Sequence, residues 1–395
     1  TKYVPKALMD HWALRDPLSN YERFLMEEGL LTEASKKELT AKWKKHIEAG
    51  LQHAFEEGDP QNDLAEELAD VYAPYTPQLT TPKTEQKTDK RFVDALSDGL
   101  RQAMEKHDKL ILMGQDIAEY GGAFKVTEGF VQRYGKARVR NTPLCESAIV
   151  GSALGLSLEG FKAMMEMQFA DFVTVGFNQI INNLAKIHYR WGQNADVVIR
   201  MPTGGGVGAG PFHSQSNEAW FMHTPGLKVV YPSTPMDAKG LLIAAINDPN
   251  PVIFFEHKAL YRSISGTVPE RYYDIEIGKA RIVQEGSDLS IITYGAAVHW
   301  AMEYASQHPE LSIDILDLRS LLPLDYAAIE EINRTSEYGS ALIAARGTKR
   351  GRRNERPAPS TETSTSPAPH CMTSVTSLGE AMPASITACA VPRVG

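Results

Sequence analysis

Glu146 and His213 are the side chains whose type and setting in the sequence best suit acid–base chemistry. Glu146 follows Pro143-Leu144-Cys145 and opens a helical run of small residues over 148–158. A carboxyl group in such an apolar, glycine-lined setting could exchange protons with a heterocycle. The alternative is an ordinary first-turn glutamate that interacts favourably with the helix dipole. Spacing alone leaves both interpretations open.

His213 begins a polar stretch, His213-Ser214-Gln215-Ser216, just after a glycine-rich run. Loops of this kind gather at the carboxyl ends of parallel strands, where α/β proteins bind their ligands. A surface histidine bonded to the backbone is the alternative. Phe169 and Phe172, which bracket Ala170-Asp171, are either core residues or the walls of a pocket for a planar ligand.

The glycine-rich run covers residues 204–210 (GGGVGAG) and matches the loose dinucleotide fingerprint at Gly204, Gly206 and Ala209. Pro211 follows in place of a clean helix, and the next predicted strand does not end in an acidic residue. These features favour a flexible loop whose glycines permit positive φ over a nicotinamide site. The sequence also has no phosphate-loop lysine motif, GxSxG elbow, HExxH zinc motif or CxxC.

The elements that position these residues are predicted from short apolar runs, which alternate along the chain with segments of helical periodicity. Such alternation predicts an α/β fold, in which a parallel sheet has helices on both faces. A first unit starts at Arg91 and a second near Ile275. The predicted strands are 109–113, 161–167, 196–201, 227–231 and 252–256, then 289–294, 311–316 and 341–344; the predicted helices are 172–189, 235–246, 297–306 and 325–333.

The two ends of the chain differ from this body. Residues 1–73 are expected to be helical, because Thr32 is a candidate N-cap and apolar residues recur every four positions from Leu39 to Phe55. Residues 74–90, rich in proline and threonine, are typical of a linker. Residues 346–395 contain a basic cluster and then Pro, Ser, Thr and Ala without any aromatic residue, which predicts a disordered tail.

Composition excludes several classes of protein. The net charge of −8 argues against a nucleic-acid partner, and no apolar run reaches the roughly 18–20 residues of a membrane span. Three cysteines exclude a disulfide framework and favour a reducing compartment, so we expect a cytoplasmic protein. The first residue is Thr1 rather than methionine, which suggests a piece of a longer chain.

Five sequence blocks follow one another along the body of the chain: NTPLCESAIVG (141–151), MEMQFADF (165–172), GAGPFHSQSNEAWF (208–221), HTPGLKVVYPSTPMDAKGLL (223–242) and NPVIFFEHKALYR (250–262). In this order they resemble the beta subunit of the thiamine-diphosphate-dependent 2-oxo acid dehydrogenases, the decarboxylating first components of the pyruvate and branched-chain complexes. Residues 1–73 resemble, less strongly, the tail of the alpha subunit (RDPLSNYERFLMEEGLLTEASKKEL, then LADVYAPY), which implies a fused alpha–beta polypeptide.

This resemblance implies a transketolase-like pyrimidine-binding domain over 91–270 and a truncated or altered transketolase carboxyl-terminal-like domain over 271–345. It also implies thiamine diphosphate as cofactor. Glu146 would hydrogen-bond the ring nitrogen of its aminopyrimidine, and His213 would assist acyl transfer to a lipoyl arm. The pyrimidine would be lined by Leu144 and Gln168 and stacked on Phe172.

The metal sites divide between this chain and an alpha part. By resemblance, Asp248 and Asn250 fall where the family binds a structural potassium ion. The diphosphate and its magnesium ion are held in the family by a GDG-plus-asparagine motif of the alpha part, and no GDG occurs here. The family's His-Glu pair after 341–344 is also missing, because Arg346-Gly347-Thr348-Lys349 follows. Such an abrupt change is typical of a shifted reading frame.

Two classes of function remain open. The first is an oxidoreductase component that works with an alpha part, with homo-oligomer contacts through the beta domains, and with the lipoylated acyltransferase core of a complex. The second is an inactive remnant or interaction module, because the diphosphate half of the site is missing. Within the first class, NPVIFFEHKALYR favours a branched-chain (2-oxoisovalerate type) substrate, and pyruvate is the alternative.

Overall fold

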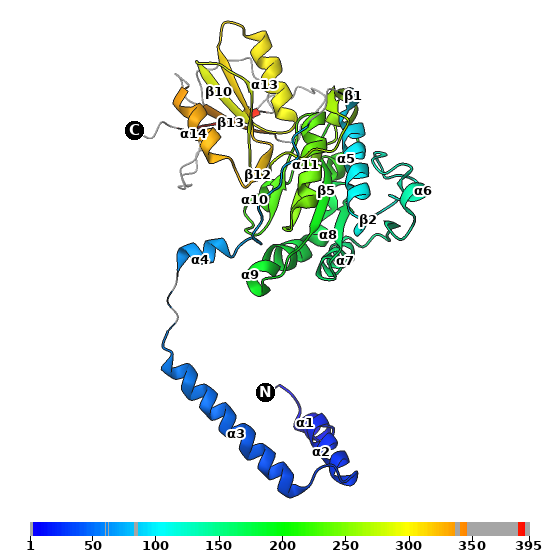
Figure 1. Cartoon of the computed structure of the whole chain (residues 1–395), viewed down its shortest axis with the longest axis vertical. Coiled ribbons are helices and arrows are strands. Elements are labelled where there is room, and N and C mark those ends of the chain that lie inside the picture. Colours follow the sequence, from blue (N-terminus) through cyan, green and yellow to red (C-terminus); the bar gives the residue numbers. More distant parts are fainter. Residues whose placement is uncertain are drawn as a thin grey trace, which may run out of the picture. The chain divides into compact units, whose positions relative to one another are not determined.

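The computed structural model describes residues 3–59, 61, 63–82, 86–335, 340–345 and 386–391 (Figure 1). The chain divides into two compact units, Thr1–Leu64 and Ala65–Gly395.

The first unit is helical, as the sequence predicts. It contains α1 (Lys6–Ala13), α2 (Pro17–Glu27) and α3 (Glu33–Glu56). Thr32 and Ser35 form a capping box at the start of α3, which confirms the predicted N-cap. The four-residue apolar repeat lies along α3 and is largely exposed within this unit, where Leu39 is 47% and Phe55 80% exposed. Part of this face lines an open hollow of about 730 Å³ between α2 and α3.

The second unit is built on a seven-stranded sheet with the order β12-β6-β7-β5-β4-β2-β3. Six of these strands are mutually parallel, and β12 pairs antiparallel with β6 at one edge. The strands are β2 (Leu110–Gly114), β3 (Val139–Asn141), β4 (Lys162–Glu166), β5 (Val197–Thr203), β6 (Lys228–Val230), β7 (Val252–His257) and β12 (Ser320–Leu322).

Helices cover both faces of this sheet, as predicted. Along β4 and its neighbours, successive side chains point to opposite faces, so each face has its own core. Met164 packs in the core with α5 (Phe92–Lys106) and α11 (Pro235–Asn247). Met165 packs in the core on the other side, with α7 (Glu146–Leu158) and α8 (Val173–Asn178).

The second alternating unit forms a five-stranded sheet, larger than the three strands predicted. Its order is β14-β13-β10-β11-β9; β10, β11 and β13 are parallel, while β9 and β14 pair antiparallel at the edges. The elements are β9 (Arg281–Gln284), β10 (Leu289–Thr293), β11 (Ile313–Asp317), β13 (Ser340–Ala345), β14 (Ile386–Val391), α13 (Ala296–Gln307) and α14 (Tyr326–Thr335).

The edge strand β14 belongs to the stretch predicted to be a disordered tail. The structure pairs these six residues with β13. The rest of that stretch, 346–385 and 392–395, lies outside the described residues, so its disorder stays a prediction.

The segment predicted as a linker lies against the body of the second unit. The Thr80 N–H donates to Asp274 Oδ1 (2.5 Å), next to a segment in which Ala73 and Asn250 exchange hydrogen bonds. Its last residues enter β1 (Lys87–Arg91), which pairs antiparallel with β8 (Ser265–Pro269). The division into compact units falls earlier, after Leu64.

One predicted helix, 172–189, is broken in the structure. It contains a 3-10 turn (Ala170–Phe172), α8, a π-helical turn (Gln179–Asn183), a second 3-10 turn (Leu184–Lys186) and α9 (Ile187–Trp191). The π turn shifts the helical register, and Ile180, Leu184 and Ile187 are all buried.

Candidate active site

The candidate site lies at the carboxyl ends of the parallel strands, where α/β sheets bind their ligands. Gln115 follows β2, Gln168 and the Phe169–Phe172 segment follow β4, and the glycine-rich loop follows β5. Lys258 follows β7, so four neighbouring strands deliver polar or aromatic groups to one edge of the sheet.

Glu146 is the first residue of α7 and is only 7% exposed. Gln115 Nε2 donates a hydrogen bond to Glu146 Oε1 (3.0 Å). Gln115 Oε1 is buried and has no hydrogen-bond partner among the described residues. Beside this pair, Leu144 is 80% exposed, although its side chain is large and apolar. The setting is therefore a buried carboxylate with an unused acceptor nearby and an apolar residue still open to a ligand.

The start of α8 lies close to Glu146. A Cβ added to Gly176 would lie 3.4 Å from the carbonyl oxygen of Glu146, so the two helices approach closely here. Phe172 is one turn earlier than Gly176 and half-buried. Gln168, also half-buried, directly precedes Phe169.

Two phenylalanines and the predicted histidine form one aromatic cluster. The ring centroids of Phe169 and His213 are 4.6 Å apart and their planes are nearly perpendicular. Phe172 lies 5.5 Å from His213 and 5.7 Å from Phe169. The structure therefore brings His213 together with two phenylalanines that the sequence singled out separately from it.

The glycine-rich run is a loop, as predicted, and Gly204, Gly206, Gly208 and Gly210 all have positive φ. Two features, the backbone φ and the closeness of a neighbouring side chain, require glycine at position 204. Its φ is +78°, and an added Cβ would lie 2.2 Å from Nε2 of His257. The loop closes on itself where the Gly204 N–H (2.9 Å) and Thr203 Oγ1 (3.0 Å) both donate to the Gln215 carbonyl.

Arg200 supports this edge of the sheet from within. Its guanidinium is fully buried on β5 and bonds Glu166 on β4 (2.7 Å) and Glu256 on β7 (2.6 and 2.7 Å). Tyr261 donates to the same Glu256 carboxylate (2.7 Å). Burial raises the pKa of Glu166, although the charge of Arg200 opposes this. The three charged residues link β4, β5 and β7 near the carboxyl ends of these strands, just before the segments that contribute residues to the site.

His257 and Lys258, at the end of β7, are both buried bases. Burial lowers the pKa of His257 to about 4, and the charge of Lys258 lowers it further. Burial lowers the pKa of Lys258 to about 8, against the opposing effect of the Asp171 charge. Lys258 Nζ lies 5.5 Å from the Phe169 ring centroid and has no hydrogen-bond partner among the described residues.

Asp248 and Asn250, the predicted potassium ligands, lie at the opposite end of β7. Because β7 has six residues at about 3.3 Å each, the two ends are on the order of 20 Å apart. Asp248 accepts hydrogen bonds from Lys228 Nζ (2.5 Å) and from the backbone and side-chain amides of Asn250, whose own oxygen accepts from Ala73. Both side chains thus already have partners, and their role as potassium ligands stays a prediction.

Sequence reasoning missed Gln115 and Lys258 and gave Asp171 no role. Gln115 and Lys258 share one signal: each is a polar residue directly after a strand that begins with four apolar residues (LILM in β2, VIFF in β7).

Two family models match the chain in succession. Residues 89–263 match the transketolase pyrimidine-binding domain, and residues 278–351 match the transketolase C-terminal domain. The 2-oxoisovalerate dehydrogenase subunit beta of Bacillus subtilis (strain 168) is 45% identical over 264 residues, which cover 66% of this chain and 80% of the relative. The chain belongs to the beta subunits of the thiamine-diphosphate-dependent 2-oxo acid dehydrogenases.

Other beta subunits are similar to nearly the same degree. The pyruvate dehydrogenase E1 component subunit beta of Bacillus subtilis (strain 168) is 43% identical over 65% of this chain and 80% of its own length. The mitochondrial 2-oxoisovalerate dehydrogenase subunit beta of Dictyostelium discoideum is 42% identical over 70% and 75%. In fold, the chain is similar to a solved structure described as "Split gene transketolase, inactive beta4 tetramer", with a TM-score of 0.53 and 20% identity over 64% of this chain and 78% of that one.

The beta-subunit site fits one half of thiamine diphosphate. The buried Glu146 carboxylate, the unused Gln115 acceptor and the open Leu144 side chain suit a small heterocycle that carries ring nitrogen and amino groups. Over the described part of the chain, no group of three or more His, Cys, Asp or Glu side chains is placed to hold a metal ion. No helix in that part is long and apolar enough to cross a membrane.

Proposed function

We propose that this chain is the beta component of a 2-oxo acid dehydrogenase that decarboxylates a branched-chain 2-oxo acid of the 2-oxoisovalerate type and transfers the acyl group to a lipoyl group. The observation that carries the proposal is the position of Glu146. It is a buried carboxylate at a helix start, held by Gln115 and close to the helix that Phe172 opens.

Thiamine diphosphate, when bound, supplies the carbon nucleophile and the electron sink for decarboxylation. Glu146 would bind the pyrimidine ring nitrogen and exchange a proton with it, while the Gln115 hydrogen bond fixes the direction of the carboxylate. Phe172 offers a ring face for stacking, and Leu144 and Gln168 line the same half of the cofactor. Its diphosphate, with magnesium, requires an alpha part, because this sequence has no GDG motif.

His213 acts in the second half of the reaction. When the acyl group is transferred, the sulfur–sulfur bond of the lipoyl dithiolane breaks. One sulfur takes the acyl group, and the other takes the electron pair and a proton. We infer that His213 donates that proton, and its half-buried position beside Phe169 and Phe172 supports this role.

Pyruvate is the second candidate substrate, because the pyruvate-named relative is only slightly less similar than the 2-oxoisovalerate-named one, at 43% against 45% identity. A catalytically inactive chain is the remaining alternative. The arrangement of Glu146, Phe172 and His213 supports the enzyme component over it.

The test is to reconstitute the chain with an alpha subunit, thiamine diphosphate and magnesium, and to measure decarboxylation with an artificial electron acceptor. We expect turnover with 2-oxoisovalerate at a higher kcat/KM than with pyruvate. A higher kcat/KM for pyruvate would show that pyruvate, and not 2-oxoisovalerate, is the preferred substrate. No turnover with either acid in an assembled, cofactor-loaded complex would support the inactive alternative.

A further inference from the structure

Asp171 holds the backbone directly after His213. It lies between Phe169 and Phe172 in the chain and is only 8% exposed. Its Oδ1 accepts hydrogen bonds from the N–H groups of Ser214 and Gln215, each at 3.0 Å. The Asp171 carboxylate therefore links the 169–172 segment, which contains both phenylalanines, to the first two residues after His213.

The loop before His213 is rich in glycine and exposed, so its own sequence does little to fix its conformation. Between Gly204 and Gly210 every second residue is a glycine with positive φ, and residues 206–212 are exposed. Glycine loses more conformational freedom on ordering than any other residue, so such a loop needs outside contacts. These contacts lie at its end, where Gln215 accepts from Thr203 and Gly204 and donates to Asp171.

Lys258 gives the buried carboxylate a cation. Its Nζ is buried and without a hydrogen-bond partner among the described residues, and the same is true of Asp171 Oδ2. The two charges interact electrostatically, and Lys258 also faces the Phe169 ring. The ends of β4, β5 and β7 thus meet around His213 through Asp171, the loop and Lys258.

We infer that Asp171 is the positioning residue for His213: its carboxylate fixes the loop so that the imidazole stays against Phe169 and Phe172 for acyl transfer. This inference rests on the proposed function of His213. Asp171 acts indirectly in this inference, through the two backbone amides that its carboxylate binds.

The first experiment measures the loop and needs no activity. Amide hydrogen exchange is followed by mass spectrometry in the full chain, in Asp171→Ala and in Asp171→Asn. Hydrogen bonds to a charged group are worth about 1.5–3 kcal/mol, so we expect exchange at Ser214 and Gln215 to accelerate about tenfold or more in Asp171→Ala. Asp171→Asn keeps an acceptor oxygen and should retain part of the protection.

Asp325→Ala is the matched control, because Asp325 also accepts from two backbone N–H groups, those of Ala280 and Ala328. It should expose those two amides and leave Ser214 and Gln215 protected. Unchanged exchange at Ser214 and Gln215 in Asp171→Ala would overturn the inference.

The second experiment separates the two half-reactions in the assembled enzyme. Under the proposed function, acylation of a lipoyl domain needs His213, whereas decarboxylation with an artificial acceptor does not. Because small misplacements of a reacting group cost up to about 100-fold, Asp171→Ala should slow acylation roughly 10- to 100-fold more than decarboxylation. His213→Asn should give the same pattern, and Asp171→Asn should restore most of the acylation rate.

The outcomes distinguish the two levels of the argument. Equal losses in both half-reactions of Asp171→Ala, with the selective loss kept in His213→Asn, would make Asp171 a purely structural residue and overturn the inference alone. If His213→Asn affects both half-reactions equally, the proposed role of His213 fails, and the positioning role of Asp171 fails with it.

Discussion

Glu146 has two roles that a single substitution separates. As the first residue of α7 it interacts with the helix dipole, and as the partner of Gln115 it offers a carboxylate to a ligand. Glutamine is nearly isosteric and still accepts the Gln115 hydrogen bond. It cannot exchange a proton with a pyrimidine nitrogen.

Glu146→Gln should therefore keep the fold and lose turnover. We expect a loss of only about 0.3–1 kcal/mol in unfolding free energy, and a fall of about 10²–10⁴-fold in decarboxylation. The measurements are the melting temperature and the artificial-acceptor assay on the same preparation. Glu159→Gln, at the exposed end of the same helix, is the control and should change neither. Near wild-type turnover in Glu146→Gln would remove this residue from the mechanism.

His257 should make the protein sensitive to acid. Its pKa falls from 6.5 in the unfolded chain to about 4 in the folded chain, so between these values the unfolded chain binds more protons. Stability is then lost as the pH falls from 6.5 to about 4, by about 3 kcal/mol from this residue. His257→Asn, which can still accept from the Ala259 N–H, should lose less stability over that interval. Parallel curves for the two proteins in denaturant titrations at pH 7, 5.5 and 4.5 would contradict this.

Whether a candidate site residue can be predicted from the sequence depends on whether its neighbours along the chain are informative. Glu146 and His213 stand out because their neighbours along the chain are informative: a small-residue helix start and a glycine-rich loop. Gln115, Asp171 and Lys258 act through contacts across strands that are far apart in the sequence. Nothing in their local sequence shows which side chain lies opposite.

Among the elements, α5 and α11 are fixed to one another by a buried charge pair. Lys239 on α11 is fully buried and donates to Asp98 Oδ2 on α5 (2.9 Å), and to the Pro269 and Glu270 carbonyls. Burial alone would raise the pKa of Asp98, but the hydrogen bonds and charges of Lys239 and Lys90 outweigh it and lower the pKa to about 2. This stabilisation is present above pH 3.8 and is lost as the pH falls towards 2.

Removing only one partner of this pair should cost more than removing both. Asp98→Leu leaves Lys239 buried without its counter-charge, and we expect a loss of about 3–5 kcal/mol in denaturant unfolding. The double variant Asp98→Leu/Lys239→Met should recover most of it. Asp94→Ala, which breaks an exposed pair with Arg91, is the control and should cost under about 1 kcal/mol. Additive losses in the double variant would show that the pair is not coupled.

Element types were easier to predict than their continuity. Long periodic segments such as α11 and α13 fall within one or two residues of the predicted ranges. Besides β14 of the predicted tail, five strands were missed, namely β1, β3, β8, β9 and β12. For β3 and β12, which have three residues each, the strand alone is too short to show alternation. The segment 172–189 has an apolar pattern that fits a helix, but the structure interrupts it with a π turn that contacts α7.

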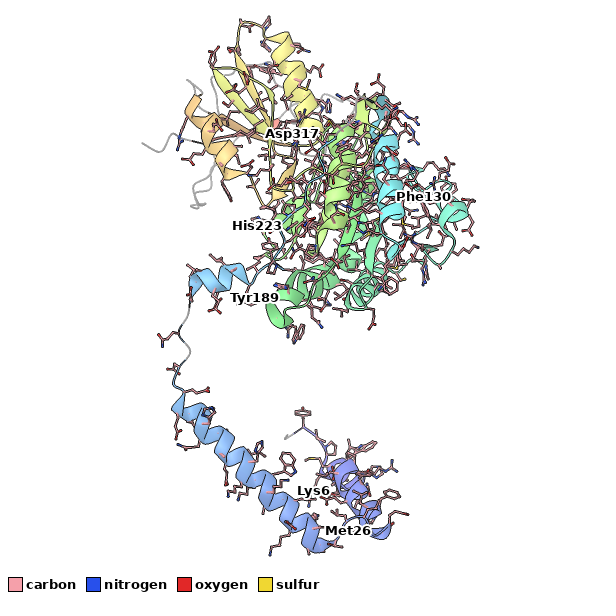
Figure 2. The ribbon with its side chains drawn as sticks, in the orientation of Figure 1. Lys6, Met26, Phe130, Tyr189, His223 and Asp317 are labelled. Carbon is pink, nitrogen blue, oxygen red and sulfur yellow. The ribbon has the colours of Figure 1, made fainter. Side chains whose placement is uncertain are left out.

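Within the second unit, the seven-stranded and five-stranded sheets are joined by a strand pairing, a hydrogen bond and a common apolar core. β12 follows β11 in the chain yet pairs with β6 of the larger sheet, and Tyr294 beside β10 donates to the buried Glu218 (3.1 Å). One apolar core includes residues of both, from Phe255 to Leu316. Asp317, marked in Figure 2, lies in a charged cluster between them, where Arg281 binds both Asp237 and Asp317.

Arg319→Met tests this coupling. Arg319 binds the buried Asp237 carboxylate (3.0 Å), and its loss should cost about 3 kcal/mol and split a single calorimetric transition into two. Arg334→Met, which breaks an exposed pair with Glu330, is the control and should leave one transition. A single transition at the control's temperature in Arg319→Met would show that the apolar core alone couples the sheets.

The chain alone should not bind thiamine diphosphate tightly. Phosphate charge requires metal or dense hydrogen-bond donors, and this sequence has no GDG motif to hold them. Calorimetric titration with cofactor and magnesium should give no micromolar binding to the isolated chain, and binding should appear when an alpha subunit is added. Micromolar affinity without it would show that the chain holds the diphosphate by itself.

The buried trio of Arg200, Glu166 and Glu256 has a consequence for how such sequences diverge. Replacing Arg200 alone would leave two carboxylates close together inside the sheet, while replacing either glutamate alone would leave the guanidinium only partly neutralised. Each single change is therefore disfavoured even where the triple change is tolerated. Descendants of this chain should keep all three residues or exchange them together, so the trio should be inherited as one character.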